Sequence, residues 1–130
     1  WATPEPTPPN VWYNGSGGSG GSSFAGADVV INLNAPATSV TVEYSGVWSG
    51  ASNESTYVSE ARAELSDGTL IEQDGIVLQP IGTWGFEVWT SQSYTLTSTT
   101  PFNRVRIRVG NNGNQNRGGG VDNIRVTVVT

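Results

Sequence analysis

Apolar and polar residues alternate along most of the chain after residue 23. This period of two is expected of half-buried β-strands, because successive side chains of a strand point to opposite faces. The clearest case is FNRVRIRV at 102–109, which places Val105, Ile107 and Val109 on one face and three arginines on the other. Such strands are predicted at 28–33, 40–44, 57–65, 70–71, 76–78, 86–89, 94–97, 102–109 and 121–129.

Turn residues separate these runs. Residues 57–65 would also allow a helix, but the turn directly after them favours a strand. With about eight short strands, many Gly and Asn turns and no convincing helix, the sequence predicts an all-β fold, a two-sheet antiparallel β-sandwich of jelly-roll type. Turns are expected at 34–36, 66–69 and 74–75, and Gly-rich loops at 45–56 and 110–120.

Residues 1–23 form an N-terminal arm ahead of a sandwich domain at 24–130. The arm is rich in Pro and Thr and then in Gly and Ser, so it has too few apolar groups to offset the entropy of being ordered. Its one strand-like stretch, NVWYN at 10–14, contains Val11, Trp12 and Tyr13. We expect this stretch to add to a sheet edge, where backbone hydrogen bonds would hold it. The edge could belong to the same domain or to a neighbouring subunit, and we expect the neighbour.

The composition excludes several classes of function. A formal net charge of −5, with six cations that are all Arg, argues against nucleic acid as a partner. The absence of Cys excludes disulfides, thiol catalysis and zinc–thiolate sites. No apolar run approaches the ~20 residues of a membrane span. Low total charge with abundant Ser, Thr, Asn and Gly, and a chain that starts at Trp1 rather than Met, lead us to expect a processed, secreted surface protein.

Three segments resemble the galactose-binding-like jelly roll, the fold of many carbohydrate-binding modules and bacterial surface domains. They are FAGADVVINLNAPATSVTVEYSG near the start of the domain and the closing pair FNRVRIRV and GVDNIRVTVV. The last of these begins with the acidic-Asn pair Asp122-Asn123, as the final strand does in that family. The resemblance covers about residues 24–130 and implies architecture, because function depends on a site rather than on a fold.

Two kinds of ligand follow from this resemblance. Sugar-binding modules of this fold stack pyranose rings on exposed aromatic side chains, for which Trp48, Trp84 and Trp89 are the candidates here. The alternative is that these tryptophans belong to the core or to a subunit contact. The fold often holds a structural Ca²⁺ near its terminal strands, where Asp122 and Asp28 are the candidate ligands. The alternative for them is ordinary turn chemistry.

The arginine row on 102–109 also has two interpretations. It could bind an anion, an acidic glycan or the acidic face of another copy, which makes Arg104, Arg106 and Arg108 candidate subunit contacts. The plainer interpretation is a solvated sheet face whose arginines pair with carboxylates across neighbouring strands. The candidate partners are Glu60, Glu64 and Glu43.

Two glycosylation sequons are present, at Asn14 and Asn53. Catalysis has little support, because the chain has no His or Cys and no recognisable pair of catalytic carboxylates. We therefore expect a non-enzymatic, secreted structural subunit that assembles with itself into an extracellular filament or fibre, its arm docking on a neighbour. The alternative is a carbohydrate-binding module that recognises glycans through exposed tryptophans.

Overall fold

A computed structural model describes residues 11–13, 24–50, 56–78, 85–86, 90–112 and 118–129. These residues form strands, and no helix occurs among them. The elements are β1 (Val11–Tyr13), β2 (Phe24–Gly50), β3 (Thr56–Glu64), β4 (Leu70–Leu78), β5 (Gly85–Phe86), β6 (Thr90–Asn112) and β7 (Gly118–Val128).

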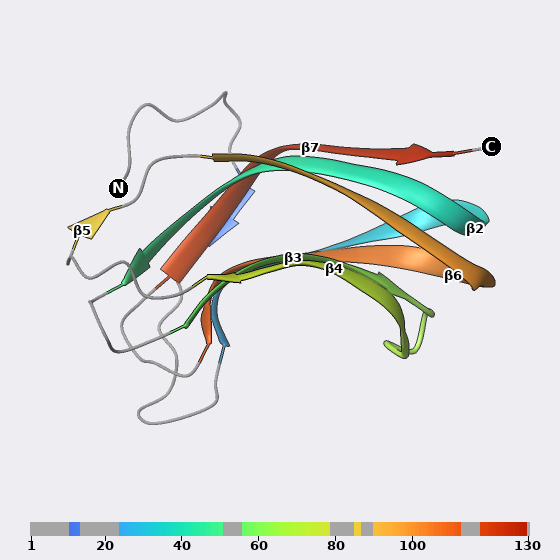
Figure 1. The fold of residues 1–130 in the computed structure, drawn as a ribbon, viewed down its shortest axis with the longest axis horizontal. Helices are drawn as coiled ribbons and strands as arrows, with labels where there is room; N and C mark the ends of the chain where they lie inside the picture. Colours follow the sequence, from blue (N-terminus) through green and yellow to red (C-terminus); the bar gives the residue numbers. More distant parts are fainter. Residues whose placement is uncertain are drawn as a thin grey trace.

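The strands lie in two layers, called here the upper and lower sheets as Figure 1 shows them. The upper sheet has the order β1, β7, second half of β2, first half of β6. The lower sheet has the order first half of β2, second half of β6, β3, β4. All of these pairings are antiparallel, which confirms the predicted two-sheet sandwich of jelly-roll type.

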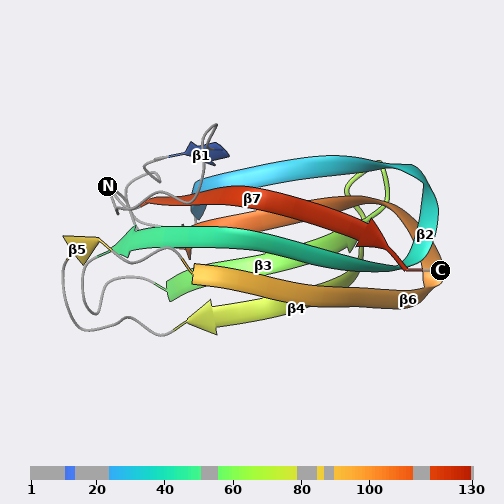
Figure 2. The same cartoon turned by 90° about the horizontal axis from the view of Figure 1, so that it is seen from above.

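The two long strands β2 and β6 pair with each other over nearly their whole length and bend together from one sheet into the other (Figure 2). The bend lies between Asn32 and Ser39 on β2, where the register shifts on either side of Ala37. Pro36 in this segment and Pro101 on β6 lack the N–H that a regular ladder would need. Phe102, fully buried and opposite Ala37, fills the inside of the bend.

The predicted turn at 34–36 is therefore a bend within a continuous strand. Asp74-Gly75, predicted as a second turn, lies inside β4 opposite Ala61 and Glu60. Gly75 has a φ of +146°, and a Cβ there would lie 2.5 Å from Glu60 Cα. The position therefore requires glycine, because β3 passes too close for a side chain. The predicted turn at 66–69 is confirmed, since Gly68 N–H donates to the Leu65 carbonyl over 2.9 Å.

The core lies between the sheets and contains the inward positions that the alternation predicts. Val105, Ile107 and Val109 of β6 are fully buried, and they face Val40 and Val42 of β2 in the same cluster. A buried polar contact also crosses between the sheets: the Tyr44 hydroxyl lies 2.7 Å from Ser59 Oγ. The outer faces of both sheets are left for charged and hydroxyl-bearing side chains.

Candidate functional surfaces

The strand predicted in the arm is present, and it pairs with its own domain. Val11, Trp12 and Tyr13 of β1 lie opposite Val121, Gly120 and Gly119 at the edge of β7. The sequence left open whether this strand pairs with its own domain or with a neighbouring subunit. In this structure of one chain it pairs with its own domain, so the expected docking on a neighbour is not the arrangement found here. What the pairing does identify is the acceptor edge, residues 119–121 of β7.

The arginine row lies on the outer face of the lower sheet and is paired with carboxylates, as the plainer interpretation expected. Arg104 Nε donates to Glu64 Oε1 over 2.9 Å, and Arg106 Nε donates to Glu64 Oε2 over 3.1 Å. Arg108 Nη1 donates to Glu60 Oε1 over 3.2 Å. Glu43, the other predicted partner, lies on the upper sheet, because β2 crosses between layers before it reaches that residue.

Further contacts close this network. Arg62 Nε donates to Glu64 Oε2 over 3.2 Å, so three guanidinium groups surround one carboxylate whose side chain is 3% exposed. Arg106 Nη1 donates to Asp28 Oδ1 over 2.7 Å. Partial burial opposes the charge of Arg106, but the carboxylates of Asp28 and Glu64 raise the pKa of its guanidinium overall. The face therefore pairs its arginines with carboxylates, and it contains a shallow hollow of about 290 Å³.

The predicted tryptophan and glycosylation sites cannot be placed as side chains. Trp84, Trp89, Asn14 and Asn53 lie outside the described residues. For Trp48 the structure gives a backbone position in β2, opposite Gly119 of β7. Sugar stacking on these tryptophans stays a prediction.

The two predicted calcium ligands lie in different settings. Asp28 is exposed and bound to Arg106, whereas Asp122 is 4% exposed within β7. Within the ranges that the structure describes, no group of three His, Cys, Asp or Glu residues could hold a metal ion. A calcium site at Asp122 stays a prediction.

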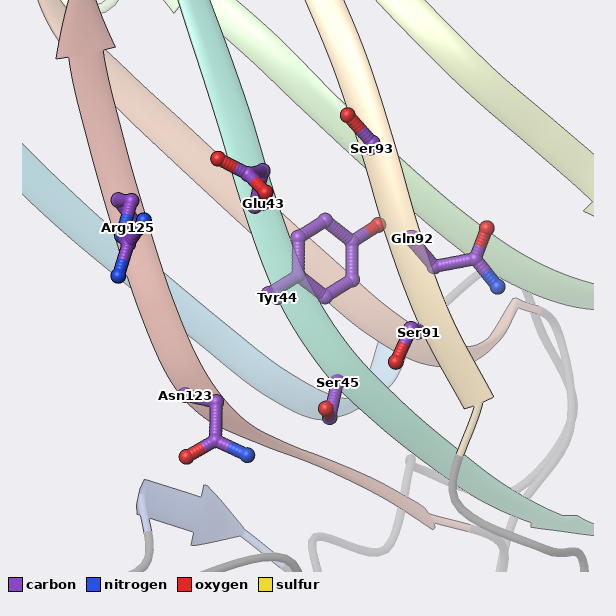
Figure 3. A pocket seen from close by; sticks show the side chains of 8 residues that line it. All are labelled: Glu43, Tyr44, Ser45, Ser91, Gln92, Ser93, Asn123 and Arg125. Carbon is purple, nitrogen blue, oxygen red and sulfur yellow. The ribbon is translucent and has the colours of Figure 1, made fainter.

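A polar hollow that the sequence analysis missed lies on the outer face of the upper sheet (Figure 3). It has a volume of about 410 Å³ and combines a carboxylate, a guanidinium, an amide and hydroxyl groups from β2, β6 and β7. Glu43 and Arg125 are direct cross-strand partners there, yet no ion pair joins them. A bulge next to them sets Asn123 at a φ of 56°. The side chains that line the hollow are Glu43, Ser45, Ser91, Gln92, Ser93, Asn123 and Arg125, with Tyr44 beneath.

An apolar groove lies between residues 31–36 of β2 and the end of β7. The segments of β2 and β7 beside it are sheet edges: among the described residues, 24–32 pair only with β6, and 124–128 pair only with β2. The groove has a volume of about 340 Å³ and is lined by Ile31, Leu33, Pro36, Val126 and Val128, with Asn32, Asn34 and Ala35 at its rim. We call this side, β2 24–33 with β7 124–128, the open side.

Comparisons with known proteins bear on the fold. Neither a scan against protein-family models nor a search of curated proteins gives a match. Among solved structures, the chain is similar to one described as "CBM4 structure and function", with 14% identity over 85% of this chain and 80% of that chain and a TM-score of 0.47. It is also similar to the VP2 subviral particle of infectious bursal disease virus, with 15% identity, 92% of this chain covered and a TM-score of 0.50.

The likeness to VP2 shows architecture alone. The chain spans 30% of the VP2 chain, so the similarity is that of one domain within a larger protein. Within the described residues, no helix has the length and apolarity to cross a membrane. Together with the strand order, the likeness to the VP2 structure describes a jelly-roll-type β-sandwich.

Proposed function

We propose that this chain is a non-enzymatic, secreted structural subunit that assembles with itself into an extracellular filament, β1 of one copy docking on β7 of the next. The observation that carries the proposal is the pairing of β1. This strand is three residues long, and its register partners are all at the edge of β7. Residues 14–23, nearly all Gly and Ser, connect it to β2.

A strand held in this way can be exchanged between copies, because the contacts with β7 are the same whichever chain supplies it. Exchange of an identical element is a low-cost route to assembly. The balance depends on the tether: within one chain, a short flexible linker gives an effective concentration of about millimolar. Above that range of protein concentration, or at a surface where copies are crowded, docking of β1 on a neighbouring copy competes with docking on its own chain. A contact from arm to edge is heterologous, so its repetition gives an open polymer.

A pair of cysteines can test this directly, since the natural chain has none. Val11→Cys with Val121→Cys joins two register partners of β1 and β7. Exchange predicts a ladder of covalent multimers on a non-reducing gel after mild oxidation of concentrated protein. The matched control is Ser39→Cys with Thr97→Cys, register partners inside the sandwich whose side-chain oxygens lie 3.0 Å apart, which should give monomer only. Monomer from both pairs at every concentration would contradict the proposal.

A second candidate function, recognition of a glycan, is favoured by the polar hollow. Sugar hydroxyls are both donors and acceptors, and carboxylate, amide and guanidinium groups are suited to bind them in pairs. The hollow presents all three beside serine hydroxyls. This candidate differs from the stacking on tryptophan that the sequence predicted, because no described aromatic ring forms its exposed surface.

Glycan-array binding distinguishes the two sugar sites. If the hollow binds, Glu43→Gln and Arg125→Gln should each abolish the signal, while the control Glu72→Gln, an exposed carboxylate on β4, should leave it intact. Binding that survives the first two changes but is lost on Trp→Phe substitution at Trp48, Trp84 or Trp89 would assign it to the tryptophans. No binding to any glycan would remove this candidate.

A further inference from the structure

The open side includes a strand edge at 124–128 whose sequence favours pairing with another strand. Residues 124–128 of β7 read IRVTV, a β-branched run with one charge and no proline, and unprotected edges of this kind pair with other strands. The inward residues Ile124 and Val126 are only partly buried, although they pack on the core. At the end of the run, Val128 and Val129 are each 49% exposed.

The sequence of the chain's own arm is poorly suited to pair with this edge. If the β1 ladder continued in register, in which paired residue numbers add up to 132, Pro8 would fall opposite Ile124 and Pro9 opposite Asn123. Neighbouring residues of a strand direct their N–H groups to opposite edges. One of two adjacent prolines therefore lacks the donor that the ladder to β7 would need. The sequence of the arm therefore disfavours a continuation of the β1 ladder along residues 124–128 of β7.

We propose that the β7 edge at 124–128 pairs with the same edge of a second copy, antiparallel and about a two-fold axis at Val126. This inference deepens the self-association proposed above but uses a different surface from β1. With Val126 on the axis, Ile124 lies opposite Val128 of the second copy, and Arg125 lies opposite Thr127. The segment is thus self-complementary: apolar residues meet on the inward face, and the two guanidinium groups stay apart. A register centred on Arg125 would oppose them directly.

Charge also favours a second copy at this side. The chain has a net charge of −5, so copies repel each other over most of their surface. The edge at 124–128 has no carboxylate and one arginine. On the neighbouring edge of β2, Asp28 is neutralised by Arg106 at 2.7 Å. The open side therefore combines exposed apolar surface with little of the repulsion found elsewhere.

Opposite charges placed at Thr127 test both the interface and its register. Thr127 is exposed, so the sandwich should keep its melting temperature in each variant. Thr127→Arg faces Arg125 of the second copy at two symmetric positions and should weaken the dimer constant from sedimentation equilibrium by about 2- to 30-fold. Thr127→Glu should strengthen it by a similar factor. The control pair Thr95→Arg and Thr95→Glu, an exposed threonine on the edge strand β6 across the sheet, should leave the constant unchanged.

Either of two results overturns the proposal. One is a chain that stays monomeric in sedimentation equilibrium at every concentration. The other is a dimer that both charges at Thr127 weaken, or that neither changes, because a two-fold axis at Val126 requires opposite signs. Since strand exchange by β1 is read from the cysteine pair at 11 and 121, either proposal can fail without the other.

Discussion

Arg104 and Glu64 are direct cross-strand partners, and their side chains meet in a hydrogen-bonded ion pair of 2.9 Å on the outer face of the lower sheet. Next to them, Arg62 lies directly opposite Arg106, an arrangement of like charges that destabilises a sheet unless something intervenes. The Glu64 carboxylate lies within 3.2 Å of both guanidinium groups. The Glu64 carboxylate therefore offsets the repulsion between these two arginines, and Glu60 and Asp28 add further ion pairs to the face.

We predict that Glu64→Gln destabilises the domain by about 3 kcal/mol, because it leaves the surrounding arginines without their shared counter-charge. The free energy of unfolding from urea titration measures this. Glu43→Gln is the matched control: it removes an exposed carboxylate that makes no ion pair with a described residue, so it should change stability by no more than about 0.5 kcal/mol. Equal effects would show that the network contributes nothing beyond a surface charge.

The hydroxyl of Tyr44 joins the two sheets through Ser59. Tyr44→Phe should cost about 1–2 kcal/mol, because it removes this buried hydrogen bond and leaves the Ser59 hydroxyl without that partner. Tyr44 is 2% exposed and its ring lies 6.0 Å from that of Tyr94, so the phenyl ring should keep its packing. Unchanged unfolding free energy would mean that water or Tyr94 replaces the bond at no cost.

Tyr44 also predicts a response to alkaline pH. Burial raises the pKa of its hydroxyl well above the ordinary value of about 10, and the hydrogen bond with Ser59 offsets only part of this. The unfolded chain thus ionises before the folded one as pH rises. The contribution to stability is complete below pH ~10 and is lost progressively above it. Urea midpoints between pH 8 and pH 11 should fall less steeply for Tyr44→Phe than for the natural chain; parallel curves would contradict this.

The sequence predicted the two-sheet architecture because the alternation on 102–109 and 121–129 depends only on neighbouring residues. It did not predict that β2 and β6 are continuous. Pro36 and Pro101 look the same locally whether a strand ends or bends, and only the pairing between β2 and β6 distinguishes the two. Asp74-Gly75 failed as a turn for a similar reason: the glycine is required by the approach of β3, which no local pattern reveals.

Site prediction met the same limit. Pairing of the arginine row with Glu60 and Glu64 was anticipated, since β3 alternates in the complementary way. Glu43 has the same chemistry, but the bend in β2 carries it to the other sheet. The sequence pattern did not reveal the polar hollow, because most of its residues are ordinary outward positions of strands far apart in sequence, and only the pairing of those strands brings them together.

Gly119 bears both on the packing of the fold and on the proposed docking of β1. It lies between Tyr13 of β1 and Trp48 of β2 in the strand register. A Cβ on Gly119 would collide with the backbone carbonyl of Val109 on the lower sheet, because β7 descends across the end of the sandwich (Figure 1). The three nearest atoms all belong to the backbone of Val109 and Gly110, so no flexible side chain could give way.

Gly119→Ala should therefore destabilise the domain by about 1–3 kcal/mol by overpacking. Gly46→Ala is the matched control, since its new Cβ would meet methyl groups of Val109 at 3.2 and 3.3 Å and a ring carbon of Tyr44 at 3.5 Å. These are side-chain atoms that can shift, so a smaller loss is expected. Because residues 119–121 are the acceptor for β1, Gly119→Ala should also slow disulfide formation between cysteines at 11 and 121, whereas Gly46→Ala should not. Unfolding free energies and the oxidation rate measure the two effects. If Gly119→Ala left both unchanged, the close approach of β7 to β6, and with it this account of the acceptor edge, would be wrong.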